Sequence, residues 1–448
     1  MSALTSAHAT AALMGGAFTA DVRITAQDGM ITALAVGAEA QPGDTRLGVV
    51  APGFVNAHSH AFHRLLRGRT HGGGGDFWVW REQMYRAAQS LTPEIYRALA
   101  EQVFAEMRDA GCTAVGEFHY VHHRPDGTPY AGHAMELALA DAAVAAGIRL
   151  VLLDTCYLRG GVGLDLSERQ RRFGDADVHA WLERWHSLHD AIAGDPHRRG
   201  LVTVGAAVHS VRAVTPDDLA VVARELPAAV PLHVHLSEQT AENDACLRAY
   251  GVTPTGLLAE HGLLRPDLAA VHATHLTDAD IALLGEAGAS IVMCPTTEAD
   301  LGDGIGPAPE LRAAGATLSI GSDQHAVIDP FEEVARLELD QRLRAQKRGI
   351  FTPAQLWHAG SSGGARALGL SGARALGLSG ARQDEAGLRV GDPFDVVEID
   401  AETTRTRGAD LLQLPLVARA SDVTATIVAG SLTRKGAAPS GLTRKGVA

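Results

Sequence analysis

The sequence predicts an α/β fold: a (β/α)8 barrel of the TIM type, with a small β-sandwich-like domain built from both ends of the chain. Two observations lead to this prediction. Apolar strand-like runs alternate with helical patterns through the middle of the chain, an order typical of a parallel sheet. The two ends instead carry short alternating runs bounded by turn residues. We expect the barrel at residues 51–383 and the two parts of the small domain at 1–50 and 384–448.

Eight strand-like segments are expected in the barrel if the apolar run before His58 is counted as the first. Helical patterns separate them, with Thr215 and Thr277 placed as N-caps and Asp280 completing a capping box with Thr277. Eight strands in this alternation close most simply as a barrel. The expected strands are residues 49–57, 111–121, 148–158, 201–208, 230–238, 269–275, 290–294 and 317–322, and the clearest helices are 93–110, 134–146, 216–226 and 278–287.

The ends of the chain contain short runs of alternating apolar and polar residues at 21–25, 394–399 and 425–430. Flanking turn residues are typical of small antiparallel sheets. We therefore expect the two ends to meet in one domain beside the barrel.

Two short duplications occur near the C-terminus. GARALGLS occupies 364–371 and again 372–379, and LTRKG occupies 432–436 and again 442–446. Because two copies cannot form a solenoid, we interpret both as local insertions at a helix end and at a loose terminus.

Composition excludes several classes of function. The chain has 448 residues, of which 46% are apolar and 20% charged, with a net charge of −13. An acidic chain is a poor partner for nucleic acid. No apolar run approaches the roughly 18 residues of a membrane span, and the first residues lack the basic segment of a secretion signal. We therefore expect a soluble, cytoplasmic protein with no nucleic-acid or membrane partner.

Cysteines and lysines limit the kinds of metal site. The four cysteines are scattered and form no Cys-x-x-Cys pair, so free thiols are expected, with two disulfides as the alternative. The three lysines are Lys347, Lys435 and Lys445. Because no lysine precedes residue 347, a two-metal site bridged by a modified lysine from a mid-barrel strand is excluded. We expect one metal ion.

The chain carries metal-ligand residue types where expected strands end. His58 and His60 follow an apolar run, and residues two apart on a strand point to the same side. A lone His-x-His among 21 histidines is weak evidence, because a histidine at a strand end is usually a hydrogen-bonded structural group. Three later strands also end in such residues, and catalytic groups in barrels project from these ends. Those residues are His233, His235 and Glu238, then His272 and His275, and finally Asp323.

Longer motifs extend this pattern from about residue 50 to residue 350. They are PGFVNAHSHAFHR, FWVWREQMYR, EFHY, HSVR, HVHLSEQTAEND, VHATH, CPTTEADLGDG and IGSDQH. With these motifs the chain resembles the amidohydrolase superfamily. More narrowly, the FWVWREQMYR and TEADLGDG runs make it similar to the formimidoylglutamate deiminases of histidine degradation.

The resemblance implies a metal-dependent hydrolase. It implies one zinc ion held by His58, His60, His235 and Asp323, although iron, cobalt or manganese suit the same ligands. Of the two histidines on the fifth strand, the family pattern selects the one three residues before Glu238, and His233 is then a packed or hydrogen-bonded neighbour. Glu238 would shuttle protons, His272 would stabilise the attacked centre, and Asp323 would also accept a proton from water.

The implied reaction is hydrolytic deimination of N-formimino-L-glutamate, in which metal-activated hydroxide attacks the formimino carbon and releases N-formyl-L-glutamate and ammonia. Two carboxylates on this substrate call for arginines, and Arg81 and Arg212 are the candidates. Tyr120 and His209 would add hydrogen bonds. His63 stands where the family usually has Gln, so another formimino amino acid is an alternative substrate. The family also implies a homodimer.

Two alternatives come from other classes. An aminohydrolase of a purine, pterin or triazine ring would use the same metal ligands but would favour aromatic stacking over paired arginines. A metal-bearing scaffold that has lost catalysis would have no reason to keep the complete set of ligands, Glu238 and His272.

Overall fold

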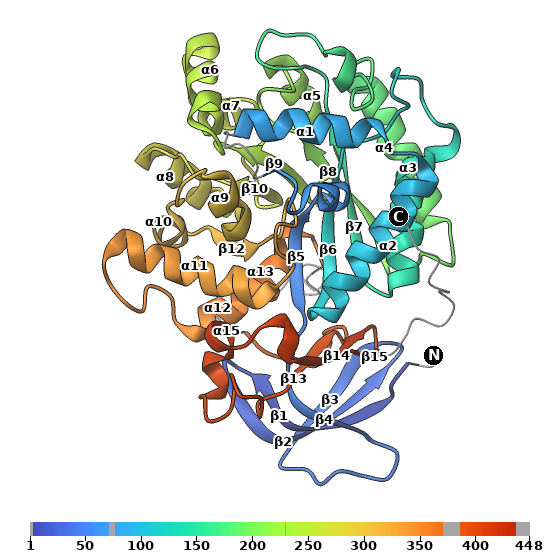
Figure 1. Cartoon of the computed structure of the whole chain (residues 1–448), viewed down its shortest axis with the longest axis vertical. Helices are drawn as coiled ribbons and strands as arrows, with labels where there is room; N and C mark the ends of the chain where they lie inside the picture. The colour runs from blue at the N-terminus through green and yellow to red at the C-terminus, as the bar shows by residue number, and fades with distance from the viewer. Residues whose placement is uncertain (1–2, 71–76, 229, 371–385, 436–448) are drawn as a thin grey trace.

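The computed structural model describes residues 3–70, 77–228, 230–370 and 386–435. Its strands form two sheets, one of eight strands and one of seven (Figure 1). All pairings in the eight-stranded sheet are parallel, and helices lie between successive strands. The predicted (β/α)8 barrel with a separate sheet from both chain ends is confirmed.

The barrel strands follow one another in chain order around the sheet. They are β5 (Phe54–Ser59), β6 (Cys112–His119), β7 (Arg149–Cys156), β8 (Val202–Val208), β9 (Leu232–Leu236), β10 (Leu268–His272), β11 (Ser290–Met293) and β12 (Thr317–Ile320). The helices are α1 (Phe77–Gln89), α2 (Pro93–Asp109), α3 (Ala134–Ala146), α4 (Val178–Ala193), α5 (Pro216–Glu225), α6 (Thr240–Tyr250), α7 (Pro254–Glu260), α8 (Asp278–Glu286), α9 (Pro295–Leu301), α10 (Ala308–Ala314), α11 (Pro330–Ala345), α12 (Pro353–Gly360), α13 (Ser362–Ala367) and α15 (Leu414–Val417).

Helix starts follow the capping chemistry expected from sequence. The Thr215 side chain accepts the backbone N–H of Asp218 at the start of α5. Thr277 and Asp280 form the predicted capping box at the start of α8. These caps satisfy N–H groups that have no partner within the helix.

The barrel closes between β12 and β5 through a short seam. Ser59 and Asp323 form a parallel bridge. The backbone N–H of His60 donates to Asp323 O at 3.1 Å, and the N–H of Asp323 donates to His58 O at 3.0 Å. Closure of the barrel therefore brings the His58–His60 segment against Asp323.

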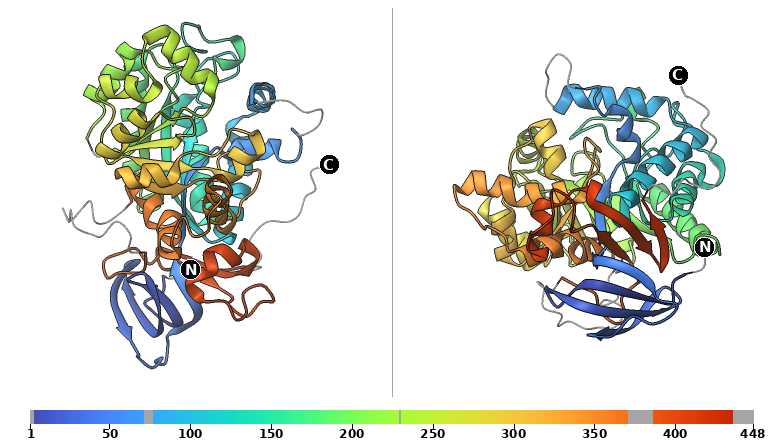
Figure 2. Two further views of the ribbon diagram at one scale, coloured as in Figure 1. Left: turned by 90° about the vertical axis from the view of Figure 1, so that its left-hand side faces the viewer. Right: turned by 60° about the horizontal axis from the view of Figure 1, so that its bottom comes forward.

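The seven-stranded sheet is built from both ends of the chain, in the order β15-β14-β13-β4-β1-β2-β3. Antiparallel pairing of β4 with β13 joins the two ends. Figure 2 shows this sheet beside the barrel at one end of the molecule. The strands are β1 (Ser6–Met14), β2 (Ala17–Gln27), β3 (Met30–Val36), β4 (Thr45–Pro52), β13 (Val396–Ile399), β14 (Val423–Val428) and β15 (Ser431–Arg434).

Side-chain alternation on β4 divides the core between the two sheets. Val49 and Ala51 pack into the main core, whereas Val50 packs into a smaller core within the seven-stranded sheet. This two-residue period is what a strand buried on both faces requires. The predicted domain boundaries near residues 50 and 383 stay predictions.

The two duplications lie only partly within the described residues. The described part of the first GARALGLS copy runs from α13 to Leu370, and that of the first LTRKG copy runs from β15 to Lys435. Both second copies lie outside the described residues, so their interpretation as insertions stays a prediction. Among the described helices, none combines the length and hydropathy that a membrane crossing requires.

Candidate active site

Four candidate metal ligands converge at the carboxyl ends of three barrel strands. His58 and His60 come from the end of β5, His235 from β9, and Asp323 from the turn after β12. His235 Nε2 lies 3.2 Å from His58 Nε2 and 3.3 Å from His60 Nε2. Asp323 Oδ1 lies 3.4 Å from His58 Nε2 and 3.5 Å from His60 Nε2. The three imidazoles therefore form one candidate ion site, and Asp323 borders it beside His58 and His60.

Each of these four separations is close to the spacing of about 3.4 Å between two ligands that are held at about 2.1 Å from a tetrahedral zinc ion. His60 Nδ1 donates to the carbonyl of Phe118 at 2.8 Å. His235 Nδ1 donates to the carbonyl of His209 at 2.9 Å. With the hydrogen on Nδ1, each neutral ring directs its Nε2 lone pair toward the other, which is favourable only around a cation. The donor set therefore fits a divalent metal.

Burial keeps these imidazoles neutral. It lowers the pKa of His58 and holds the pKa values of His60 and His235 well below the ordinary value. Burial alone would raise the pKa of Asp323, but the hydrogen bond and charge of His58 outweigh it and lower that pKa. Neutral imidazoles beside an ionised carboxylate are the states in which these groups bind metals.

Glu117, at the end of β6, holds the segment that carries His58 and His60. Ser59 Oγ donates to Glu117 Oε2 at 2.5 Å, and the backbone N–H of Ala61 donates to Oε1 at 2.6 Å. Burial raises the pKa of Glu117 to about 8. One carboxyl group thus holds the Ser59 side chain and the Ala61 backbone, on either side of His60.

His272 ends β10 beside the candidate ligands. Its Nε2 lies 3.9 Å from both Asp323 Oδ2 and Glu238 Oε1, and its Nδ1 lies 3.4 Å from Glu298 Oε1. Burial opposes the charged form of His272, but the nearby carboxylates, that of Glu238 first, raise its pKa. Burial raises the pKa of Glu238 to about 7. A carboxyl group that titrates near neutrality can both accept and return a proton.

Strained backbone concentrates around this centre. Five non-glycine residues at the ends of β9, β10 and β12 have positive φ angles between 42° and 67°. Such conformations persist only where the surrounding structure enforces them, and they cluster at functional sites. They are Ser237, His272, Ala273, Asp323 and His325.

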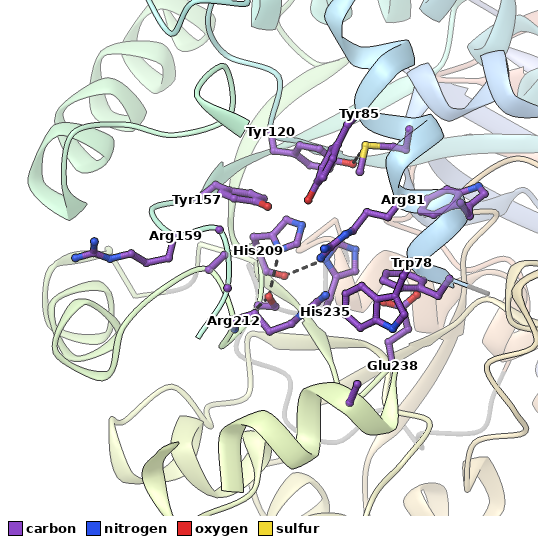
Figure 3. Close-up of a pocket in the computed structure, with 18 of the residues that line it drawn as sticks. Trp78, Arg81, Tyr85, Tyr120, Tyr157, Arg159, His209, Arg212, His235 and Glu238 are labelled. Carbon is purple, nitrogen blue, oxygen red and sulfur yellow. Dashed lines mark hydrogen bonds between the residues drawn. The ribbon is translucent and has the colours of Figure 1, made fainter. Parts of the chain in front are cut away.

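A pocket of about 250 Å³ opens onto the same centre (Figure 3). Loops after the barrel strands and the helix α1 form its walls. All five residues predicted to bind substrate line it, together with Glu238, His272 and Asp323; the five are His63, Arg81, Tyr120, His209 and Arg212.

Aromatic rings and hydrogen bonds position several of these side chains. The Arg81 guanidinium lies over the ring of Trp78, 4.4 Å from its centroid, and 5.6 Å from that of Tyr85. His63 Nε2 and the Tyr120 hydroxyl are hydrogen-bonded at 3.0 Å. The pocket therefore contains fixed cationic and polar groups next to the candidate metal centre.

Not every predicted candidate belongs to the centre. His233 shares the face of β9 with His235, but its Nε2 bonds the carbonyl of Ala367 at 2.9 Å. Three buried acids at the site have no assignment from sequence, although each lies inside one of the quoted motifs. They are Glu117 in EFHY, Glu242 in HVHLSEQTAEND and Glu298 in CPTTEADLGDG.

The family model of the amidohydrolases matches residues 49–432 of this sequence. The chain belongs to the amidohydrolase family. Members generally bind a divalent metal, and this amidohydrolase has candidate His and Asp groups for one.

Individual relatives agree with this assignment. The chain is 40% identical over 354 residues to formimidoylglutamate deiminase of Pseudomonas aeruginosa, covering 76% of this chain and 77% of that protein. It is 31% identical over 424 residues to 5-methylthioadenosine/S-adenosylhomocysteine deaminase of Natronomonas pharaonis, covering 92% and 88%. A crystal structure of an amidohydrolase from Brucella melitensis superimposes with a TM-score of 0.86 at 35% identity, covering 96% and 95%. This amidohydrolase is therefore a hydrolase of carbon–nitrogen bonds with deaminase relatives, for which a small-molecule substrate is expected.

Proposed function

We propose that this amidohydrolase is a formimidoylglutamate deiminase, which hydrolyses N-formimino-L-glutamate to N-formyl-L-glutamate and ammonia. The observation that carries the proposal is the pair Arg81 and Arg212 in the pocket that is also lined by His60, His235 and Asp323. Two guanidinium groups suit a substrate with two carboxylates. The similarity to the Pseudomonas aeruginosa deiminase supports the same substrate.

The metal in this proposal is one zinc ion held by His58, His60, His235 and Asp323. Three imidazoles and one carboxylate also suit iron, cobalt or manganese. When bound, a divalent metal lowers the pKa of water to about 7 and so makes hydroxide available at neutral pH.

Proton transfers fall to the residues around the metal site. Addition of water to the formimino carbon requires a base, and the carboxylates that line the pocket are those of Glu238 and Asp323. Expulsion of ammonia then requires a proton on the departing nitrogen. Because its pKa lies near neutrality, Glu238 can take the proton from water and deliver it to that nitrogen. His272 stabilises charge that develops at the attacked carbon.

The remaining pocket residues orient the substrate. Burial, followed by the charges of Arg212 and Arg81, holds the pKa of His209 well below its ordinary value, so this ring is neutral and offers a hydrogen bond. The Tyr120 hydroxyl and His63, which are bonded to each other, supply further polar atoms.

Ammonia release from a panel of compounds tests the proposal. N-formimino-L-glutamate should exceed guanine and adenosine in kcat/KM by about 100-fold or more, because a site built for two carboxylates rejects ligands that leave its charges unpaired. N-formimino-L-aspartate, a dicarboxylate one methylene shorter, should have a kcat/KM about tenfold below that of N-formimino-L-glutamate. Preference for guanine or adenosine would instead favour the ring aminohydrolase. Inactivity of the metal-loaded protein on all four compounds would contradict the proposal.

A further inference from the structure

Arg212 lies between the pocket and a buried acid that faces it from α6. Its side chain is only 13% exposed, and its Nε lies 3.8 Å from Oε1 of Glu242, whose side chain is 0% exposed. Figure 3 shows Arg212 at the pocket with His209, His235 and Glu238. Glu242 is absent from the pocket lining, so it meets Arg212 from the protein side.

Two buried carboxylates act on this guanidinium. Burial by itself lowers the pKa of Arg212, but the charge of Glu242 and then that of Glu238 outweigh it. Burial raises the pKa of Glu242, and the Arg212 charge opposes that rise. A buried guanidinium without a counter-charge is unfavourable, so Arg212 must pair with an acid whenever the pocket holds no anion. Glu238 is the other acid available.

The two pocket arginines are supported differently. Arg81 is stacked on Trp78 and Tyr85. The Phe77 ring centroid lies 6.0 Å from the Arg212 guanidinium carbon, so aromatic support there is weaker. Arg212 therefore depends on Glu242 for its position in a way that Arg81 does not.

We propose that Glu242 is a positioning residue, which holds Arg212 at the pocket wall for a substrate carboxylate and prevents it from pairing with Glu238. The inference rests on the proposed function, since it assigns Arg212 to an anionic group of the substrate. The two acids then have different roles. Glu242 neutralises the Arg212 charge, and Glu238 remains free to transfer protons.

Glu242→Gln removes the charge and keeps the volume. The guanidinium should then turn toward Glu238, and a substrate carboxylate must displace it. We expect the affinity for N-formyl-L-glutamate, measured by calorimetry on the metal-loaded protein, to fall about tenfold. The KM for N-formimino-L-glutamate should rise by a similar factor. Asp244→Asn removes an exposed charge from the same helix and should change neither the affinity nor the KM by more than about twofold.

A double-mutant cycle separates positioning from a general structural effect. Arg212→Met removes the group through which Glu242 acts, so Glu242→Gln in that background should change affinity by less than about twofold. Additive effects of the two substitutions would overturn the inference, as would unchanged or tighter binding by Glu242→Gln alone. If Glu242→Gln does not fold, Glu242→Asp takes its place in the double-mutant cycle. Its effect on affinity should likewise disappear in the Arg212→Met background.

The wild-type protein distinguishes this inference from the proposed function. Failure of the wild type to bind N-formyl-L-glutamate and to deiminate N-formimino-L-glutamate overturns the proposed function, and the inference with it. If the wild type binds and turns over its ligands normally but the effects of Glu242→Gln and Arg212→Met are additive, only the inference about Glu242 is overturned.

Discussion

His60 Nε2 and His235 Nε2 lie 3.3 Å apart, although 175 positions separate the two residues in the chain. Each ring is fixed by an Nδ1 hydrogen bond to a backbone carbonyl, so the two lone pairs converge. His233 lies two residues away on the same face of β9 and bonds the carbonyl of Ala367 instead. One strand thus supplies an imidazole to the candidate metal centre and another to the surrounding structure.

Replacing His235 by Asn should remove bound metal while leaving the barrel folded. Loss of one of four ligands should weaken metal affinity by about 100-fold or more and abolish turnover with it. Zinc content after dialysis, measured by mass spectrometry, provides the readout. His233→Asn is the matched control and should keep its metal. Equal losses in the two variants would contradict the assignment of His235.

Glu238→Gln should retain metal and lose turnover. An amide of the same size cannot accept and return a proton, so kcat should fall by about 10³-fold. Metal analysis and steady-state kinetics on the same preparation separate the two effects. Activity within about tenfold of the wild type would exclude Glu238 as the proton shuttle.

The fall of kcat/KM at acidic pH should reflect the protonation of Glu238. Burial raises the pKa of Glu238 to about 7, so Glu238 becomes protonated as the pH falls through that value. Only the ionised form can take a proton from water, and kcat/KM should therefore decline below about pH 7. Steady-state assays between about pH 5 and pH 8 test this expectation, and a flat profile would contradict it.

Much of the barrel and of its candidate centre can be predicted from local patterns. Residues close in sequence predict the capping box of Thr277 and Asp280. They also predict the strands that end near His58, His235 and His272. Strand ends in a parallel barrel share one face, so the residue types at those ends already predict a common site.

Contacts between distant segments account for what local patterns miss. Glu117 becomes a support for the metal-ligand segment only when β6 pairs with β5. Glu242 faces Arg212 only when α6 packs behind the loop after β8. A buried acid inside a motif has no spacing that reveals its partner. The choice between His233 and His235 likewise depends on depth along β9 rather than on the face of the strand.

Glu117→Gln should weaken metal binding without removing a ligand. A Gln amide places N–H donors where one oxygen now accepts from Ser59 or Ala61, so the His58–His60 segment loses one hydrogen bond. Metal affinity should fall by about 10- to 100-fold, measured by competition with a chelator.

Glu338→Gln provides the matched control for that substitution. Glu338 is equally buried and accepts the backbone N–H groups of Ile350 and Phe351, outside the pocket lining. Its replacement should lower thermal stability and leave metal affinity unchanged. Comparable loss of metal in both variants would indicate that general destabilisation, rather than the Glu117 contacts, is responsible.

His63→Gln should preserve activity on N-formimino-L-glutamate to within about threefold, whereas His63→Ala should lower kcat/KM by about tenfold. A Gln side chain can still bond the Tyr120 hydroxyl, which His63 Nε2 now contacts at 3.0 Å, and Ala cannot. Metal content should stay constant in both variants. Equal activity of His63→Ala and the wild type would remove His63 from the substrate site.

Asp175→Asn should destabilise the protein in a pH-dependent way. Asp175 Oδ2 lies 2.9 Å from Arg184 and its Oδ1 3.4 Å from His123 Nε2. Burial opposes ionisation, but the Arg184 charge outweighs it and lowers the pKa of Asp175 below the ordinary 3.8. A lowered carboxyl pKa stabilises the fold above the unfolded-state value, and this contribution is lost as the pH falls through the folded-state value.

The stability gap between wild type and Asp175→Asn should therefore be about 3 kcal/mol at neutral pH and should narrow only below the unfolded-state pKa of 3.8. Thermal midpoints of both proteins, measured at neutral pH, near pH 5 and below pH 3.8, test whether the stability gap narrows only at the lowest pH. Asp165→Asn is the control, because the Asp165–Arg159 pair is 92% and 47% exposed and should contribute less than about 1 kcal/mol. A gap that is constant across this range would exclude the ionised Asp175–Arg184 pair as its source.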